Sequence, residues 1–391
     1  MTPGARVQAA IECLEAILAG EPAERGLTRW ARQSRFAGSK DRAAVRDHVY
    51  AVLRRKRACA AAGGGESGRA LMLGLMRLEG DDPAALFNGQ GHAPAPLSDA
   101  ETAMIAAPLP ALPEPELPSW LVPRLEAQYG VDLPEQLAAL TQRAPVFLRV
   151  NLRKCNPEQA RAALAREGVV TQPELGARTA LRITEGERML VRTQAYAQGL
   201  VELQDVSSQA AMETLPLRDG MRILDYCAGG GGKTLAMAGL VQAQFAAHDA
   251  APGRMRDLRE RAARAGVAVD ILSGAECARA TPFDLVLCDV PCSGSGTWRR
   301  DPDAKWRFTP ERLAELNATQ DEILDTAAGF VAGGGVLVYA TCSILREENT
   351  DQIEAFTARH PDWEIAFQRQ WRLSAAGDGF FVGHLTRAAG L

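Results

Sequence analysis

The sequence predicts an α/β fold: a doubly wound parallel sheet in the C-terminal half, preceded by a small α+β segment and an all-helical N-terminal domain. The sheet is indicated by short apolar runs that alternate with helical stretches after about residue 201. Runs of this kind, separated by helices, are typical of buried parallel strands. The predicted strands are residues 221–225, 244–249, 267–272, 283–289 and 334–342.

The N-terminal part has helical periodicity instead. Apolar residues recur on one face of residues 6–20, and a second helical stretch runs from about Ser39 to Arg57. A Pro- and Ala-rich stretch follows, which predicts a linker or an extended surface segment. A strand at 145–151 and a helix at 157–167 then begin the small α+β part. The predicted domains are helical over 1–85, linker over 86–118, an α+β insert over 119–200 and the sheet domain over 201–391.

Composition excludes several classes of protein. Apolar residues make up 47% of the 391 residues and charged residues 24%, as in ordinary globular proteins. No stretch approaches the roughly 20 apolar residues that span a bilayer, so we expect no membrane association. The eight cysteines are scattered without CxxC spacing, which predicts a cytoplasmic, reduced protein without a metal site.

The charge is distributed unevenly along the chain. The net charge of -4 does not by itself indicate a nucleic-acid-binding protein. Residues 1–60, however, hold 12 Lys and Arg against 6 Asp and Glu, a balance of +6. This asymmetry fits a basic docking arm, although a solvated helical surface fits the charge equally well.

A glycine-rich loop follows the first predicted strand, which ends at Asp225. The loop and the helix after it form an element that cradles nucleotides, because glycines let the backbone approach a ligand and free N–H groups point at it. An ATP-binding P-loop would require Gly where Cys227 stands, and a dinucleotide fingerprint would require Gly at Thr234. Asp249, after the next strand, is favoured as a ribose acceptor over a simple helix cap. The cofactor site is assigned to Cys227, Ala228, Gly229, Gly230, Gly231, Gly232, Lys233, Asp249, Arg254 and Asp289.

Two cysteines follow predicted strand ends. Asp289 ends one strand, Cys292 lies in the Pro-Cys-Ser-Gly loop after it, and Cys342 ends the last predicted strand. Because ligands bind at the carboxyl edge of open α/β sheets, these three side chains should converge beside the cofactor. A lone cysteine is more often a small buried hydrophobic residue. That interpretation applies to Cys13, Cys59, Cys155, Cys277 and Cys288.

Several motifs together resemble one family. DYCAGGGGKT, DVPCSGSG, YATCS and GDGFFVGHL, flanked by FLRVN and QGLVELQDVSSQAA, are similar to the Sun/Nop (RsmB-like) family of RNA cytosine-C5 methyltransferases. The resemblance covers about residues 140–391, and four motifs in order make it specific. Residues 1–60 resemble the helical RNA-binding extension similar to NusB. Together they imply S-adenosylmethionine as cofactor, a Rossmann-like methyltransferase domain and ribosomal RNA, 16S rRNA in particular, as substrate.

The resemblance implies roles for four residues. Cys342 would be the nucleophile that adds to carbon 6 of cytosine, so that carbon 5 can accept the methyl group. Cys292 would aid product release, and Asp289 would engage the base. Lys233 would lie between cofactor and substrate. An inactive RNA-binding ribosome-assembly factor is the alternative, and a nicotinamide dehydrogenase is disfavoured because the glycine fingerprint is missing.

The chain departs from the family pattern at two positions. Gly230 replaces a proline of the cofactor loop, which predicts a more flexible loop. Gly274 stands where the family usually has an aspartate near the adenine, with Glu276 as a candidate substitute. Both departures predict weaker cofactor binding, and they are the reason for keeping the inactive assembly factor as an alternative.

A basic and aromatic segment follows the Pro-Cys loop. Its cations can hold phosphates while its aromatic rings stack on splayed bases. An ordinary folded connection with tryptophan in the core is the other interpretation, and we expect core packing for Trp306. The RNA contacts are assigned to Arg299, Arg300, Lys305 and Arg307. RNA is thus the expected partner, and a monomer is expected.

Overall fold

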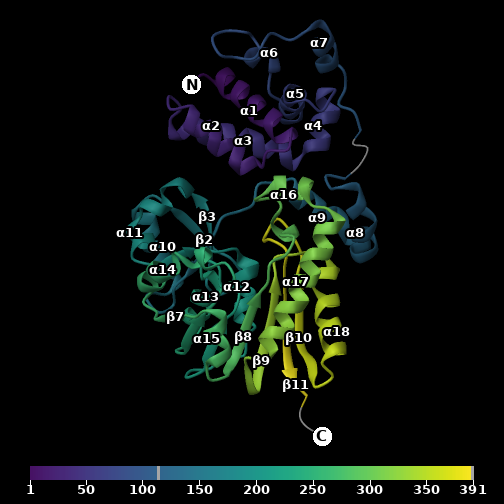
Figure 1. Ribbon diagram of the computed structural model, residues 1–391. Coiled ribbons are helices and arrows are strands. Elements are labelled where there is room, and N and C mark those ends of the chain that lie inside the picture. The colour runs from purple at the N-terminus through teal and green to yellow at the C-terminus, as the bar shows by residue number, and fades with distance from the viewer. Residues whose placement is uncertain (112–114, 389–391) are drawn as a thin grey trace. The chain divides into compact units, whose positions relative to one another are not determined.

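The computed structural model describes residues 1–111 and 115–388 (Figure 1). The chain divides into two compact units. The helical unit is Met1–Arg143 with Trp298–Phe308, and the sheet unit is Ala144–Thr297 with Thr309–Leu391. The helical unit therefore extends to residue 143, well beyond the predicted boundary near 85. No helix within the described ranges has the length and apolar character needed to cross a membrane.

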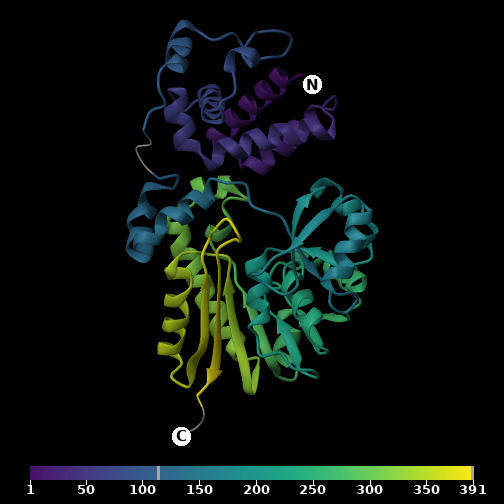
Figure 2. The same ribbon diagram turned by 180° about the vertical axis from the view of Figure 1, so that it is seen from behind.

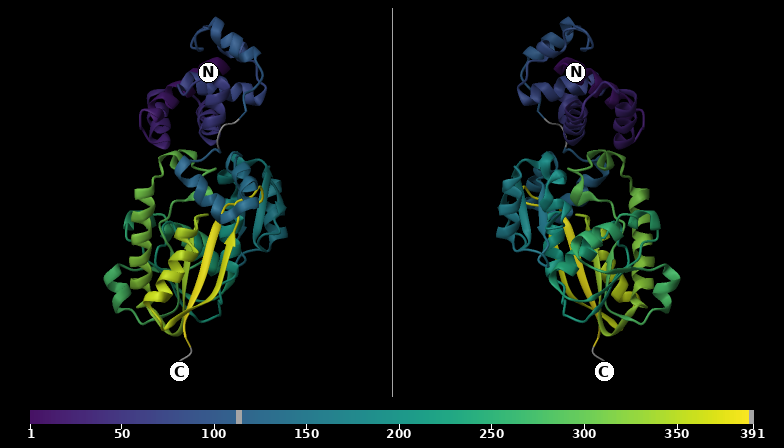
Figure 3. Two further views of the ribbon diagram at one scale, coloured as in Figure 1. Left: turned by 90° about the vertical axis from the view of Figure 1, so that its right-hand side faces the viewer. Right: turned by 90° about the vertical axis from the view of Figure 1, so that its left-hand side faces the viewer.

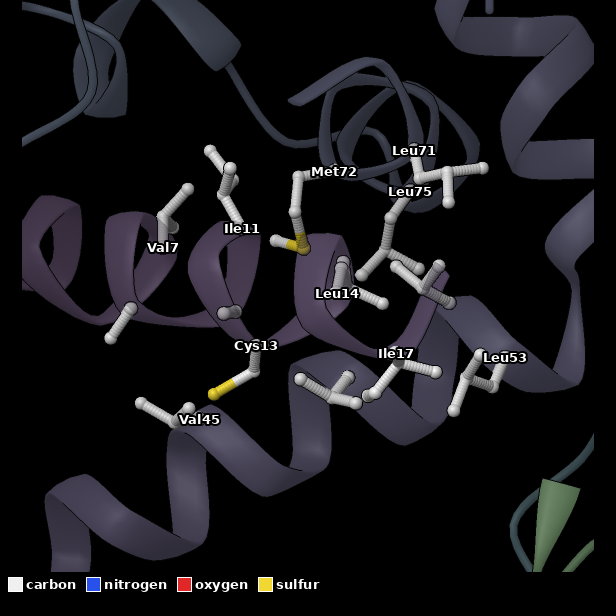
Figure 4. Packing of buried hydrophobic residues seen from close by; sticks show 14 of the residues in the cluster. Val7, Ile11, Cys13, Leu14, Ile17, Val45, Leu53, Leu71, Met72 and Leu75 are labelled. Atoms are coloured by element: carbon white, nitrogen blue, oxygen red, sulfur yellow. The ribbon is translucent and has the colours of Figure 1, made fainter. Parts of the chain in front are cut away.

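The helical unit packs around its first helix. Figure 4 shows α1 lying between α3 and α5, with Leu14 and Ile17 of α1 in the core. Leu14 is fully buried, as are Val45 of α3 and Leu71 of α5. Both helices predicted here are present. The helices are α1 (Pro3–Leu18), α2 (Ala23–Gln33), α3 (Ser39–Arg54), α4 (Lys56–Gly63), α5 (Gly68–Glu79), α6 (Pro83–Leu86), α7 (Asp99–Ala106), α8 (Val122–Tyr129), α9 (Leu133–Leu140) and α16 (Pro302–Arg307).

The stretch predicted as a linker is partly folded, which corrects that prediction. It holds α7, whose first turn has a capping box between Ser98 and Glu101. Glu101 also pairs with Arg69 of α5 at 2.7 Å. Phe87 and Leu117, near the two ends of the stretch, are 2% and 0% exposed. The segment rich in Pro and Ala therefore packs on the helical unit through a few buried side chains and one ion pair. Residues 112–114 lie outside the described ranges.

The segment after the Pro-Cys loop folds into the helical unit. Trp298 packs on Phe308, which packs on Trp120, with ring centroids 5.7 Å apart in both pairs. Trp306, which lies partly buried, donates its indole N–H to the carbonyl of Leu53 at 2.6 Å. The aromatic residues of this segment therefore serve the fold.

A small antiparallel sheet begins the sheet unit, with strand order β2-β3-β1-β4. The predicted strand and helix at its start are β1 and α10. The last strand ends at Leu203, just beyond the predicted end of this part at residue 200. Its elements are β1 (Phe147–Val150), α10 (Pro157–Arg166), β2 (Val170–Pro173), β3 (Ala180–Glu185), α11 (Gln194–Ala197) and β4 (Val201–Leu203).

A seven-stranded sheet forms the rest of the unit, in the order β10-β11-β9-β8-β5-β6-β7. The five predicted strands are confirmed as β5 to β9, and they are parallel to their neighbours among themselves. The C-terminal hairpin of β10 and β11 is antiparallel and was not predicted. The strands are β5 (Arg222–Asp225), β6 (Gln244–Ala247), β7 (Val269–Ile271), β8 (Phe283–Asp289), β9 (Val331–Thr341), β10 (Trp363–Trp371) and β11 (Phe380–Arg387).

Helices cover both faces of this sheet (Figures 2 and 3). Alternate residues of each strand point to opposite faces. Leu287 of β8 therefore packs with α12 and α13, whereas Cys288 packs with α17 and α18. These helices are α12 (Val206–Glu213), α13 (Gly232–Leu240), α14 (Leu258–Ala265), α15 (Gly274–Arg279), α17 (Pro310–Ala328) and α18 (Thr350–Arg359), with short 3-10 turns η1 (Ser119–Leu121), η2 (Gly130–Asp132), η3 (Glu187–Arg192), η4 (Pro252–Met255), η5 (Ser295–Thr297) and η6 (Arg346–Glu348).

The strand order reverses beside β5. The chain runs from β5 outward to β6 and β7, then returns to place β8 and β9 on the other side of β5. Such a reversal opens a crevice at the carboxyl ends of the strands, where open α/β sheets bind ligands. The glycine loop follows β5, and the Pro-Cys loop follows β8. Both therefore lie at this switch point.

Buried Lys305 gives the helical unit a pH-dependent stability. Burial lowers the pKa of its ammonium group from 10.5 to about 7, although Glu116 opposes the shift. The folded state then binds fewer protons than the unfolded chain between about pH 7 and 10.5, so the free energy of unfolding rises with pH across that window. We expect Lys305→Met to flatten this rise and to stabilise the protein by about 1 kcal/mol below pH 7.

Chemical denaturation followed by tryptophan fluorescence between pH 6 and 10 measures the effect. Lys40→Met, at an exposed position, is the matched control and should leave the pH dependence unchanged. An unaltered pH dependence in Lys305→Met would show that Lys305 keeps its proton in the folded protein.

Candidate active site

The glycine loop is shaped by two residues with positive φ. Gly229 has φ of 50° and Gly231 has φ of 77°, a region that side chains with a Cβ rarely occupy. A Cβ on Gly231 would lie 2.1 Å from Leu258 Cδ1, so the position also has no room for one. Gly231 caps the N-terminus of α13. The first N–H groups of that helix have no acceptor within the helix, so a ligand at this end can accept hydrogen bonds from them.

Asp249 is tied to the same loop. Its carboxylate accepts hydrogen bonds from the Gly229 N–H at 2.9 Å and from the Ala251 N–H at 2.9 Å. Arg254 Nη1 lies 3.1 Å from the same carboxylate. The structure therefore brings three of the assigned cofactor residues together. A buried carboxylate beside a glycine loop and a helix N-terminus fits the ribose of a nucleoside cofactor.

Asp225, at the end of β5, has an unused oxygen. Thr234 donates to its Oδ2 at 2.6 Å. Within the described part of the chain, its buried Oδ1 has no hydrogen-bond partner. Burial raises the pKa of Asp225 to about 7, against the hydrogen bond from Thr234 and with a contribution from Asp289. An orphaned acceptor at the base of the loop is the kind of group that a bound ligand or water satisfies.

Gly274 stands at the position where the family pattern has an acid. Gly274 begins α15, and a Cβ there would lie 3.7 Å from the ring of His248. That ring stacks on Tyr226 with centroids 4.8 Å apart. Glu276 does not replace the missing carboxylate, because it caps its own helix by accepting from the Ser273 N–H at 2.8 Å. The aromatic pair is therefore what the structure places beside this position.

Lys233 and Asp289 form an ion pair across the switch point. Lys233 Nζ lies 2.5 Å from Asp289 Oδ2, and 5.1 Å from the centre of the Phe380 ring. Burial alone would lower the pKa of Lys233, but the charge and hydrogen bond of Asp289 raise it above its ordinary value. Lys233 is therefore charged at neutral pH. Asp289 keeps 30% of its side chain exposed, so it remains accessible to a substrate.

The two loop cysteines meet. Their sulfur atoms are 3.4 Å apart, a contact distance well beyond the roughly 2.05 Å of a disulfide. The hydrogen bond between the two sulfur atoms, in which either can be the donor, lowers the pKa of Cys342; burial and Asp289 oppose this, and Lys233 supports it. The same hydrogen bond, with burial, raises the pKa of Cys292. The contact therefore favours deprotonation of Cys342 over deprotonation of Cys292.

A fully buried glutamate joins the two cysteine loops. Glu348, from the 3-10 turn after β9, is 0% exposed. Its carboxylate accepts from the Ser293 N–H at 2.7 Å and the Ser293 hydroxyl at 2.5 Å. It also accepts from the Ser343 hydroxyl at 2.5 Å and from Gln320 Nε2 at 3.2 Å. A buried carboxylate needs such donors, because leaving it unsatisfied costs several kcal/mol.

This arrangement fixes the cysteines through their neighbours. Ser293 directly follows Cys292, and Ser343 directly follows Cys342. Glu348 therefore ties together the two loops that carry the cysteines. The local sequence gives little sign of this role beyond the acidic pair Glu347 and Glu348, which follows Cys342 closely.

The C-terminal motif packs under the same loops. The backbones of Gly296 and Gly379 touch, since a Cβ on Gly296 would lie 2.1 Å from the Gly379 carbonyl oxygen. The Gly296 N–H donates to the carbonyl of Cys342 at 2.9 Å. Asp205 accepts from the Asp378 N–H at 3.2 Å. The glycines of DVPCSGSG and GDGFF therefore permit a close backbone contact beneath the cysteines.

The strand motif FLRVN supports the glycine loop from the small sheet. Arg149 of β1 is 5% exposed and donates to the carbonyl of Gly232 at 2.7 Å. Glu202, opposite Arg149 on β4, pairs with Arg261 at 3.0 Å. Arg261 in turn donates to the carbonyl of Gly230. The loop is therefore held at two carbonyls, which offsets the flexibility predicted from the missing proline.

The four residues assigned to RNA contacts fall into two pairs. Arg299 and Lys305 are 0% and 1% exposed, so the structure contradicts direct phosphate contacts for these two. They are buried because their segment packs its tryptophan inward. Arg300 and Arg307 are exposed, and for them RNA contact stays a prediction.

Comparison with protein families matches two parts of the chain. Residues 212–383 match the model described as 16S rRNA methyltransferase RsmB/F. Residues 117–189 match the ferredoxin-like domain of RsmF/B-like methyltransferases. This second match covers most of the predicted α+β insert.

Two similar curated proteins have the same name. The chain is 37% identical over 286 residues to ribosomal RNA small subunit methyltransferase B of Klebsiella pneumoniae, covering 69% of the chain and 66% of that protein. It is 34% identical over 284 residues to the protein of the same name from Escherichia coli, with the same coverage. The chain thus spans about two thirds of the length of these relatives.

Two solved structures share the fold. The crystal structure of PH0851 superimposes with a TM-score of 0.77, at 22% identity, over 99% of both chains. The structure of NSun6 from Pyrococcus horikoshii has a TM-score of 0.62, at 17% identity, over 70% of this chain and 99% of that one. At such identities the likeness establishes the fold alone.

The two central glycines of the loop should respond differently to substitution. We expect Gly231→Ala to destabilise the protein by about 2 kcal/mol or more, because it combines positive φ with a clash against Leu258. Gly230→Pro is the matched control. Gly230 has no positive φ, and an added Cβ would meet only the flexible end of Arg261. Urea denaturation measures both, and equal losses would contradict the loop geometry.

Cys342 should react as a thiolate at lower pH than an ordinary cysteine. We expect Cys292→Ala to move the midpoint of its alkylation by iodoacetamide to higher pH, because the hydrogen bond that stabilises the thiolate is lost. Cys292→Ser keeps a donor and should shift the midpoint less. Mass spectrometry of the Cys342 peptide across pH 6–10 measures the rate, and an unchanged midpoint in Cys292→Ala would remove the coupling of the two thiols.

Proposed function

The chain belongs to the RsmB/F methyltransferase family, and from this premise we propose that it methylates carbon 5 of a cytosine in ribosomal RNA, with S-adenosylmethionine as methyl donor. The observation that carries the proposal is the contact of Cys292 and Cys342, at 3.4 Å, beside the Lys233–Asp289 ion pair. A cysteine thiolate beside a cation and a carboxylate suits covalent catalysis on a pyrimidine ring.

The cofactor would bind along the glycine loop. Asp249 would accept hydrogen bonds from the ribose hydroxyls, and the N-terminus of α13 would receive the polar end of the molecule. Tyr226 and His248 would supply an aromatic surface on the adenine side. When bound, S-adenosylmethionine supplies an electrophilic methyl group on a sulfonium. NSun6, which has the same fold, has been solved with SFG.

Cys342 would act first on the cytosine. Its thiolate adds to carbon 6 and forms a carbon–sulfur bond, and the electron pair of the 5,6 double bond becomes available at carbon 5 for the methyl group. Asp289 would bond to the N3/N4 edge of the base and stabilise the adduct. Lys233 keeps Asp289 in position and holds positive charge near the sulfur.

Release of the product requires the reverse movement of electrons. The proton on carbon 5 leaves to a base, the double bond re-forms and the carbon–sulfur bond breaks, returning its electron pair to Cys342. Cys292 is the nearest thiol to that sulfur and would assist this step. Its raised pKa keeps it protonated until the adduct forms. In one catalytic cycle, Cys342 would therefore act as the nucleophile and Cys292 would assist release of the product.

The substrate would be ribosomal RNA of the small subunit, as the names of the relatives indicate. A stacked cytosine cannot reach Cys342 at the edge of the sheet, so the target should be unpaired or flipped. The helical unit and the small sheet are proposed as RNA-binding parts. A catalytically weak assembly factor is the alternative, and the missing acid at Gly274 is the observation in its favour.

Replacing each of the two cysteines by alanine tests the mechanism. We expect Cys342→Ala to abolish transfer of tritiated methyl groups to small-subunit RNA while cofactor binding is retained, because the nucleophile alone is lost. We expect Cys292→Ala to accumulate a protein–RNA adduct that survives denaturation, because attack still occurs but release does not.

Cys288→Ala serves as the matched control, since this fully buried thiol faces α17 and α18. Methyl transfer by Cys342→Ala would exclude it as nucleophile. Absence of transfer by the unmodified protein, with intact RNA binding, would favour the assembly factor.

A further inference from the structure

Figure 1 shows the turn that joins α2 to α3 in the helical unit. Phe36 lies in this turn with 77% of its surface exposed. It forms one wall of a cavity of about 590 Å³, which Trp30 and His92 also line. Most of the other lining residues are small or apolar. The exposed ring of Phe36 and this mostly apolar cavity are therefore open to a ligand.

Arginines adjoin the cavity. A cleft of about 580 Å³ is lined by Arg32, Arg35 and Arg42, and Arg35 directly precedes Phe36. A further cleft of about 670 Å³ along α2 shares Arg32 and adds Arg25. Residues 23–42 hold six Lys and Arg against two Asp and Glu, a balance of +4 in a chain of net charge -4.

The acidic groups nearby already have partners. Glu12, which lines the cavity, accepts from Gln8 Nε2 at 3.0 Å. Glu21 pairs with Arg29 at 2.8 Å, and Asp41 pairs with Arg6 at 2.8 Å. Glu24 accepts from the Tyr50 hydroxyl at 3.0 Å. Within residues 1–111 and 115–388, no ion-pair partner is found for Arg25, Arg32, Arg35 or Lys40. Their charge is therefore available to an external anion.

We propose that this corner, formed by Arg25, Arg32, Arg35, Phe36, Lys40 and Arg42, binds a single-stranded segment of the RNA substrate, with one unstacked base on Phe36. The inference rests on the RNA substrate of the proposed function. The cations hold successive phosphates while the ring and the apolar cavity receive a base. Paired RNA offers no free base face, so the exposed ring favours a loop or single strand. An acidic protein would match the charge but would not need an aromatic platform beside the cavity.

Binding of the full chain to a fluorescein-labelled ten-nucleotide unstructured RNA tests the proposal. Fluorescence anisotropy across salt concentrations gives both affinity and its salt dependence. We expect Phe36→Ala to weaken binding about tenfold, and Phe36→Trp to restore it, because the ring stacks on a base. We expect Arg32→Ala and Arg35→Ala each to reduce the slope of log affinity against log salt by about 0.7.

Matched controls separate this corner from general charge effects. Arg312→Ala removes an exposed arginine that already pairs with Glu315 at 2.7 Å, and it should leave binding unchanged. A hairpin duplex of equal length should bind more weakly than the single strand and should not respond to Phe36→Ala. An equal loss of RNA affinity in Arg312→Ala, or no loss of affinity in Phe36→Ala, would overturn the proposal. A protein would then be the partner to consider for this surface.

Methyl transfer is measured separately on small-subunit RNA. Failure of transfer with binding that remains sensitive to Phe36 would overturn the proposed reaction alone. Transfer that proceeds equally well in the Phe36 and arginine variants, with unchanged RNA affinity, would overturn this inference alone.

Discussion

The site depends on the burial of one carboxylate between two loops. Glu348 has no exposed surface and takes its donors from Ser293, Ser343 and Gln320. A buried carboxylate without donors is costly, so the loops after β8 and β9 cannot separate unless water replaces those donors. The same two loops carry the sulfur atoms that lie 3.4 Å apart. The thiol pair is therefore held in place by residues that do no chemistry themselves.

Contacts from distant segments also hold the other loops of the crevice. The C-terminal hairpin brings Phe380 against Lys233 and lays Gly379 on Gly296. The small sheet reaches the glycine loop through Arg149, which holds the carbonyl of Gly232. Segments from four distant parts of the chain thus converge on the switch point of one sheet. A family motif such as FLRVN then has a physical purpose, since it supports a loop that it does not adjoin in sequence.

The helical unit contains two kinds of basic residue, buried ones and exposed ones. Arg299 and Lys305 serve the fold and are enclosed, whereas the arginines around Phe36 face solvent beside a cavity. The net charge of the chain conceals this basic corner, because residues 61–143 of the helical unit and the sheet unit both carry an excess of acids. Affinity for a polyanion depends on the local arrangement of cations and not on the total charge.

The sequence by itself determined the sheet, its five parallel strands and the loops at their ends. Strand burial, helical periodicity and the need for glycine at positive φ are local properties, and local patterns record them. The convergence of Asp289 and the two cysteines also followed, because parallel strands end at one edge. Only the tertiary structure decided which polar groups are buried. From the local sequence, Glu348 would be an exposed residue at a helix start and Lys305 a phosphate ligand. In the folded protein both side chains are buried. Satisfaction of a buried charge is settled by partners far away in the chain, and no local pattern contains that information.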